Sequence, residues 1–239
     1  MKRYIVYIKS VFLLALVVFL YGFASLRNDK RIVKGPLIEF SNGNNLFLSH
    51  EMVDKLLKQN RESLGNDSKS LINLHELEQG VLTNPLVEEA KVFITVDGVL
   101  KAMVKQRTPV LRVQSENHTY YIDDKGLKMP MSENYSARVM LTSGPILDED
   151  IEPIYTLVKA ILSNDFLKKM IVGIEKKSKS DYVLHTRKYR QQIHFGAIQG
   201  VSSKIKKLEA FYNEAIQSKD LATYKVINLK YNNQVVCSK

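Results

Sequence analysis

Residues 91–104 read KVFITVDGVLKAMV. Two apolar runs rich in β-branched residues flank the pair Asp97-Gly98. This pair is typical of a two-residue type I′ turn, because both turn positions need a positive φ that Asp and Gly tolerate. The stretch therefore predicts a β-hairpin with strands at residues 91–96 and 99–104.

The residues before the hairpin predict one strand and two helices. Residues 37–40 form a strand candidate, and Ser49 is suited to cap a helix whose apolar residues share one face. A polar stretch at residues 59–70 predicts a long loop. Asn73 begins a second helix with a capping-box pattern, and Pro85 stops it. Together with the hairpin, this order predicts a small α+β domain with both helices on one face of a three-stranded sheet.

The second half of the chain is richer in strands. Thr108-Pro109 interrupts the last strand of the hairpin and marks the boundary between the halves. Asp148 is suited to cap one helix, and Gly200 opens a longer one. The predicted strands lie at residues 120–122, 125–127, 138–141, 170–175, 181–186, 192–195 and 224–229, with a continuation at 234–237.

The N-terminus predicts a segment that crosses a membrane. Residues 11–26 read VFLLALVVFLYGFASL, without a charge and apolar on all sides, which a core helix would not be. An uncleaved anchor and a signal peptide cleaved after Ala24 both fit, and both export the rest of the chain. The residues predicted to lie in the bilayer are Val11, Phe12, Leu13, Leu14, Leu16, Val17, Val18, Phe19 and Leu20.

The whole chain is then predicted to be an α+β protein in four parts. These parts are a short cytoplasmic tail at residues 1–10, a transmembrane helix at 11–26, the small domain at 34–110 and a strand-rich domain at 111–239. The last domain is expected to end in an edge strand, because the chain ends there.

The composition of the chain argues against a nucleic-acid-binding protein and a disulfide-stabilised secreted protein. The 239 residues are 45% hydrophobic and 25% charged, and the net charge of +10 comes from dispersed lysines and arginines without a nucleic-acid-binding motif. The densest basic run, at residues 176–180, predicts a solvated turn between two strands. Cys237 is the single cysteine, which excludes an internal disulfide and a cysteine-based metal site.

Catalytic and metal-binding patterns are absent from the sequence. The five histidines form no zinc-binding motif, and there is no nucleotide-binding loop or nucleophile elbow. The acidic run Asp148-Glu149-Asp150 is explained by the helix macrodipole. We therefore predict neither catalytic residues nor a cofactor, and leave an exported enzyme and a basic lipid- or peptidoglycan-binding protein as alternatives.

The order of these elements resembles the FtsQ/DivIB family of bacterial cell-division proteins, and the small domain resembles the POTRA domain of that family. The Asp97-Gly98 turn departs from the longer turn of many relatives, and Lys230 replaces their usual Arg, as in a divergent branch. The stretches that carry the resemblance are residues 38–44, 48–53, 84–92, 108–110, 121–126 and 229–236.

The resemblance implies a single-pass scaffold of the division septum, in the inner membrane with both domains in the periplasm. Its partners would be the small coiled-coil proteins FtsB (DivIC) and FtsL, with FtsK-like proteins, FtsW and the septal transpeptidase as further contacts. A POTRA-containing protein of outer-membrane assembly or secretion is the alternative.

The terminal strand is the predicted partner-binding site. A strand at a sheet edge offers unpaired backbone groups to a partner strand, and an exposed aromatic residue suits a binding hot spot. An ordinary sheet tyrosine at position 231 is the competing interpretation. The predicted site residues are Lys230, Tyr231, Asn232, Asn233, Gln234 and Val235.

Overall fold

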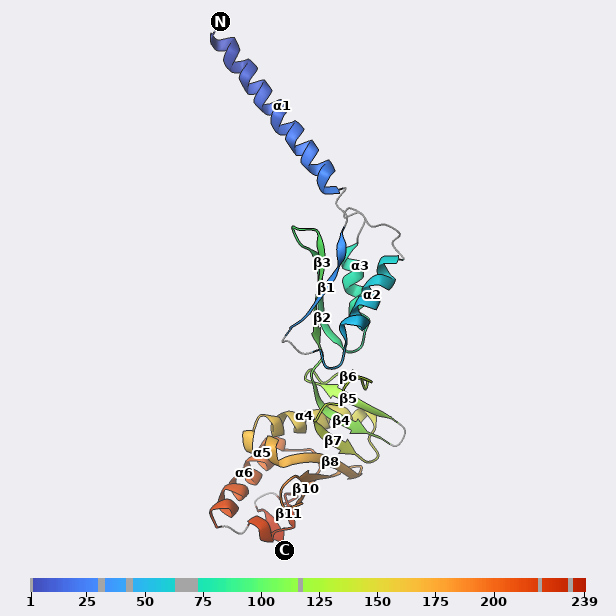
Figure 1. Cartoon of the computed structure of the whole chain (residues 1–239). Helices are drawn as coiled ribbons and strands as arrows, with labels where there is room; N and C mark the ends of the chain where they lie inside the picture. Colours follow the sequence, from blue (N-terminus) through green and yellow to red (C-terminus); the bar gives the residue numbers. More distant parts are fainter. Residues whose placement is uncertain are drawn as a thin grey trace. The chain divides into compact units, whose positions relative to one another are not determined.

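The computed structural model describes residues 2–29, 33–41, 45–62, 73–115, 118–218, 221–231 and 234–239. The chain forms two compact units, Met1–Gln106 and Arg107–Lys239 (Figure 1). The predicted mixed α+β fold is confirmed: an apolar N-terminal helix precedes a three-stranded sheet with two helices, and the second unit is rich in strands and ends in a strand.

Helix α1 (Lys2–Asp29) contains the predicted span. Its stretch Lys9–Leu26 has a mean hydropathy of 2.0, and none of that stretch is buried. At about 1.5 Å of rise per residue, such a helix is long enough to cross the hydrocarbon layer of a bilayer, which is roughly 30 Å thick. An exposed apolar helix is compatible with a single-pass membrane protein.

The first unit holds a mixed sheet with the strand order β1-β3-β2. The central strand β3 (Val99–Gln106) pairs in parallel with β1 (Lys34–Phe40) and antiparallel with β2 (Val87–Ile94). Along β3, Leu100, Ala102 and Val104 are buried, and the residues between them face outward. This alternation places the core of the unit on one face of the sheet.

Helices α2 (His50–Glu62) and α3 (Leu74–Leu82) pack beside this sheet, as Figure 1 shows. Both predicted caps are confirmed, because Ser49 Oγ accepts a hydrogen bond from the amide of Met52 at 3.2 Å and Asn73 Oδ1 accepts one from Glu76 at 3.2 Å. Of the predicted loop at 59–70, the first residues belong to α2, and residues 63–72 lie outside the described part of the chain.

The hairpin between β2 and β3 is confirmed, but the predicted turn type is wrong. The amide of Gly98 donates to the carbonyl of Thr95 at 2.9 Å, and the amide of Thr95 donates to Val99 at 2.9 Å. Gly98 has a φ of 79°, whereas Asp97 is not among the residues with positive φ. A type I turn followed by a left-handed glycine therefore replaces the type I′ turn, which needs two residues with positive φ.

The second unit is built on a nine-stranded sheet with the order β12-β11-β10-β9-β8-β7-β4-β5-β6. Neighbouring strands run parallel at β4–β7, β7–β8 and β10–β11 and antiparallel elsewhere. The strands are β4 (Pro109–Gln114), β5 (Thr119–Asp123), β6 (Lys128–Met129), β7 (Met140–Ser143), β8 (Ile171–Ser178), β9 (Asp181–Thr186), β10 (Gln192–Gly196), β11 (Val226–Asn228) and β12 (Val236–Ser238).

Three α-helices share the apolar core of this unit. The helices α4 (Ile151–Leu162), α5 (Asp165–Met170) and α6 (Val201–Gln217) contribute buried residues that pack with those of the strands. Short 3-10 helices are η3 (Asp148–Asp150) before α4 and η4 (Leu221–Thr223) after α6. Helix α5 was not predicted; the side chain of Asn164 starts it by accepting hydrogen bonds from two amides.

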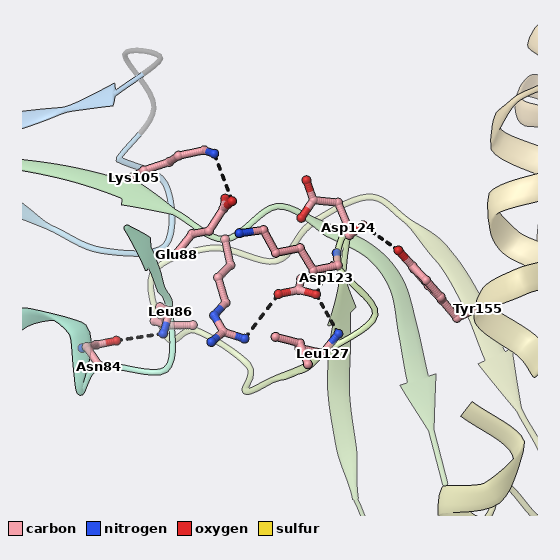
Figure 2. Close-up of polar contacts among 10 residues, drawn as sticks. Asn84, Leu86, Glu88, Lys105, Asp123, Asp124, Leu127 and Tyr155 are labelled. Atoms are coloured by element: carbon pink, nitrogen blue, oxygen red, sulfur yellow. Dashed lines mark hydrogen bonds and ion pairs between the residues drawn. The ribbon is translucent and has the colours of Figure 1, made fainter. Parts of the chain in front are cut away.

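The turn after β5 replaces the strand predicted at residues 125–127. Buried Asp123 uses one carboxylate oxygen to accept from the amides of Lys125 and Leu127, at 3.0 and 2.8 Å, and its other oxygen lies 3.3 Å from Arg107 (Figure 2). Tyr155 of α4 donates to the carbonyl of Asp124 at 2.6 Å. A side chain that holds two amides of the next residues makes a turn at the expense of the strand.

The basic run at residues 176–180 is the predicted solvated turn only at its end, where Lys179 and Ser180 are exposed, because β8 continues through Ser178. Lys176 is buried at 5% exposure and forms an ion pair with Asp150. The acidic run before α4 is also more than a response to the helix macrodipole, since Asp150 is buried and Asp148, which was predicted to cap the helix, lies in η3.

Candidate functional site

One edge of the large sheet is strand β12, the last strand in the described part of the chain, and the other edge is β6. It pairs antiparallel with β11, and Cys237 lies opposite Ile227. Val235 and Cys237 pack against the core, whereas Val236 is 42% exposed. No strand of the described part of the chain pairs with the outer side of β12. The backbone groups on that side are therefore available to a partner strand.

The structure places the described members of the predicted site between β11 and β12 and not within one strand; these members are Lys230, Tyr231, Gln234 and Val235. Leu229 is fully buried and its amide still donates to His194 at 2.9 Å, so the chain follows β10 up to this point. The side chain of Asn228 then accepts a hydrogen bond from the amide of Lys230 at 2.9 Å. An Asn side chain that takes the place of a ladder partner starts a turn, which explains why the predicted strand ends here.

Tyr231 lies in this turn, directly after Lys230. Its side chain is 50% exposed, and its carbonyl accepts a hydrogen bond from Lys207 of α6 at 2.9 Å. The hydrogen bond from Lys207 thus connects the backbone of Tyr231 to the helix, while half of the residue stays exposed to solvent. Gln234 is exposed just before β12, and the predicted residues Asn232 and Asn233 lie outside the described residues.

Lys230 is fixed by two contacts that the sequence did not predict. Its ammonium group lies 2.7 Å from a carboxylate oxygen of Asp181, the first residue of β9. Its stem passes Gly196, at the end of β10, so closely that a Cβ on this glycine would lie 2.9 Å from Lys230 Cγ. Gly196 also has a φ of 70°. Only glycine fits this conformation and this approach without strain.

A basic hollow of about 600 Å³ opens beside Lys230, at the N-terminus of α6. Three lysines line it, and Lys204 donates to the carbonyls of Phe195 and Ala197 at 2.8 and 2.7 Å. Burial, together with the neighbouring charges of Lys207 and Lys230, lowers the pKa of Lys204. Asp181 also lines the hollow and pairs with Lys230. The other two lysines and the amino end of α6 leave the hollow with net positive charge, which suits a carboxylate of a partner.

The described residues offer no metal site. They contain no group of three or more His, Cys, Asp or Glu side chains that could hold a metal ion. His185 Nε2 lies 2.9 Å from a carboxylate oxygen of Glu175 on the neighbouring strand, which is a pair at the sheet surface. The groups that this surface presents are the backbone groups of β12, the half-exposed Tyr231 and the lysines of the hollow.

Sequence reasoning missed Asp181, Gly196, Lys204 and Lys207. The lysines repeat at the spacing of one helical turn near the start of α6, which could have indicated a basic helix end. Gly196 and Asp181 left no such pattern, because their importance comes from pairing with a residue far along the chain.

Two family models match the chain. One, described as FtsQ/DivIB, C-terminal related, matches residues 108–238, which is more than half of the chain and includes the edge strand. The other, described as a POTRA-like domain, matches residues 38–105 and covers helices α2 and α3 and most of the three-stranded sheet. No curated protein matches the sequence.

Proposed function

The chain belongs to the FtsQ/DivIB family, and from this premise we propose that it is a single-pass scaffold of the bacterial division septum. The pairing of a POTRA-like domain with an FtsQ/DivIB-related domain is that of a cell-division scaffold. We further propose that its partners are small single-pass coiled-coil proteins of the FtsB/DivIC and FtsL types, and that it helps to recruit and regulate septal peptidoglycan synthesis.

The observation that carries the proposed binding site is the open edge of β12 next to a half-exposed tyrosine. A partner strand on this edge gains main-chain hydrogen bonds, and its side chains then meet Tyr231 and Val236. An acidic side chain of the same partner could bind in the basic hollow, which lies beside Lys230 on the same surface. Backbone pairing, an aromatic anchor and a charge contact together give affinity and register.

We propose the remaining topology from the helix α1. With residues 11–26 in the inner membrane, residues 1–10 are the cytoplasmic tail, and the domains at 34–110 and 111–239 lie in the periplasm. FtsK-like proteins, FtsW and the septal transpeptidase are then further partners within reach at the septum.

The test is capture of the full-length protein from cells in mild detergent, followed by identification of the co-purifying proteins. We expect single-pass coiled-coil proteins in near-equal amounts. Tyr231→Glu should reduce their capture at least tenfold, because the bound partner would cover position 231 and a charge buried in an interface is costly. Tyr189→Glu is the control, since Tyr189 is 40% exposed on the turn between β9 and β10.

Each outcome decides a separate part of the proposal. Equal capture by wild type and Tyr231→Glu would remove the site but leave the scaffold. Co-purification of outer-membrane assembly or secretion proteins instead would support the alternative of a POTRA-containing envelope protein and remove the divisome assignment.

A further inference from the structure

A second hollow lies in the unit Arg107–Lys239, at the other end of β8 from the basic hollow. It has a volume of about 620 Å³ and is lined by the first residues of three neighbouring strands, Pro109 of β4, Met140 of β7 and Ile171 of β8. The basic hollow is lined by Ser178, at the carboxyl end of β8. Eight residues of extended chain separate the two by roughly 25 Å. We call this second hollow the β8-start groove.

The floor of the β8-start groove is apolar and recessed. Met140 and Ile171 are 6% and 2% exposed, so they lie below the surface of the unit. Val110 and Leu162 are half-buried and pack against the same core. An inserted apolar side chain would exchange water for contacts with this floor, which is favourable in proportion to the area covered.

The rim of the groove carries three cations from three different segments. Arg138 precedes β7, Lys168 belongs to α5, and Arg187 follows β9. All three are exposed, and their side chains form no hydrogen bond or ion pair with any described residue. The lining contains no acidic residue among the described ones.

The basic hollow differs in this respect. There Lys204 and Lys207 donate to backbone carbonyls and Lys230 pairs with Asp181. The cations of the β8-start groove have no such partners among the described residues, so a ligand there would not compete with contacts that already exist.

We propose that the β8-start groove docks an acidic, amphipathic peptide segment of a partner protein. Its carboxylates would meet Arg138 and Arg187, whose flat guanidinium groups match a carboxylate with two parallel hydrogen bonds. An apolar side chain between the carboxylates would reach the floor. A protruding side chain can enter a recessed floor, whereas the flat surface of a bilayer covers only the rim. This surface is additional to the proposed edge of β12.

The test uses the full-length protein in nanodiscs of phosphatidylcholine and a fluorescein-labelled peptide of twelve residues in which glutamates alternate with leucine and phenylalanine. Fluorescence anisotropy should show saturable binding. Binding should weaken at least tenfold for a peptide with every Glu replaced by Gln, and at least tenfold for Arg138→Gln combined with Arg187→Gln.

The control variant combines Lys169→Gln with Arg190→Gln, which removes exposed charges from the same helix and the same turn without touching the groove. It should bind the peptide as the wild type does. Tyr231→Glu should also leave peptide binding unchanged, so a failure of the edge site and a failure of this groove are distinguishable. Thermal unfolding of each variant shows that it is folded.

The proposal is overturned by an absence of saturable binding, or by equal binding to the groove variant and the wild type. It is also overturned if the peptide does not bind while vesicles of phosphatidylglycerol bind the wild type and not the groove variant. In that case the cations contact a lipid surface.

Discussion

The ammonium group of Lys176 donates a hydrogen bond of 2.5 Å to Asp150, and both side chains are buried. Tyr182 donates to the other carboxylate oxygen at 2.9 Å, and the amide of Leu147 donates at 2.8 Å. The pair joins β8 to the start of α4. A buried ion pair that is satisfied in this way specifies one arrangement of the two elements, because loss of either partner leaves a buried charge unpaired.

Lys176→Met should therefore destabilise the protein by about 3 kcal/mol, since it leaves the carboxylate of Asp150 buried without its counter-charge. The measurement is urea unfolding of the full-length chain in mild detergent, followed by circular dichroism. Lys177→Met is the matched control, because Lys177 is the next residue and its pair with Glu175 is exposed to solvent. The control should change stability by less than about 1 kcal/mol. If both variants lost the same unfolding free energy, the buried pair would contribute no more to stability than the exposed one.

The same pair predicts a pH dependence of stability. Burial raises the pKa of Asp150, but the hydrogen bonds from Lys176, Leu147 and Tyr182 outweigh it and hold the pKa below its ordinary value of 3.8. A pKa that is lower in the folded state gives stability that is complete above the ordinary value and is lost as the pH falls through the folded value. Between pH 6 and pH 3, the wild type should lose more unfolding free energy than Asp150→Asn. Parallel curves for the two proteins would exclude this contribution.

Local interactions were predictable from the sequence. Ser49 and Asn73 cap their helices through bonds to amides three residues away, and such bonds leave a readable pattern. Gly98 likewise indicates the hairpin, because a tight turn is a local feature. The turn type was not predictable, since it depends on the φ of Asp97, which is not positive. The membrane-spanning length of α1 follows from composition alone.

Interactions between distant residues were not predictable. Lys176 lies in a basic run that looks solvated, and only Asp150, 26 residues earlier, explains its burial. Tyr231 was predicted in a strand, and the contacts that fix its turn come from distant residues: Lys207 donates to its carbonyl, and the neighbouring Lys230 pairs with Asp181. A single sequence gives the apolar pattern of each element but not which residues of different elements meet.

Charges within α1 should detach the protein from the membrane. Leu14 and Val18 are exposed on the helix and lie within its apolar stretch. Leu14→Arg with Val18→Arg should disfavour insertion by roughly 2.5–3.5 kcal/mol per residue. Carbonate extraction of membranes should leave the wild type and the control pair Leu14→Ala and Val18→Ala in the pellet, but not the arginine pair. The intact mass of the wild type should include residues 1–24, whereas a chain that starts at Ser25 would establish the cleaved signal peptide.

Alanine substitutions at Gly196 and Gly200 distinguish the effect of backbone strain from the effect of displacing Lys230. Both have positive φ, at 70° and 59°, so an alanine at either position should cost about 1–2 kcal/mol. A Cβ at Gly196 would collide with Lys230 Cγ at 2.9 Å, whereas a Cβ at Gly200 meets nothing within 4 Å.

Gly196→Ala should therefore shift Lys230 away from Asp181 and weaken capture of the coiled-coil partners several-fold, because Lys230 and Tyr231 belong to the same turn. Gly200→Ala should lose comparable stability but weaken capture less than Gly196→Ala, because Gly200 lines the basic hollow without touching Lys230. Thermal unfolding compares the stability of the two variants, and co-purification from cells compares their binding. If both variants captured the partners equally well, the position of Lys230 would be irrelevant to binding. The proposed site would then be reduced to the backbone edge of β12.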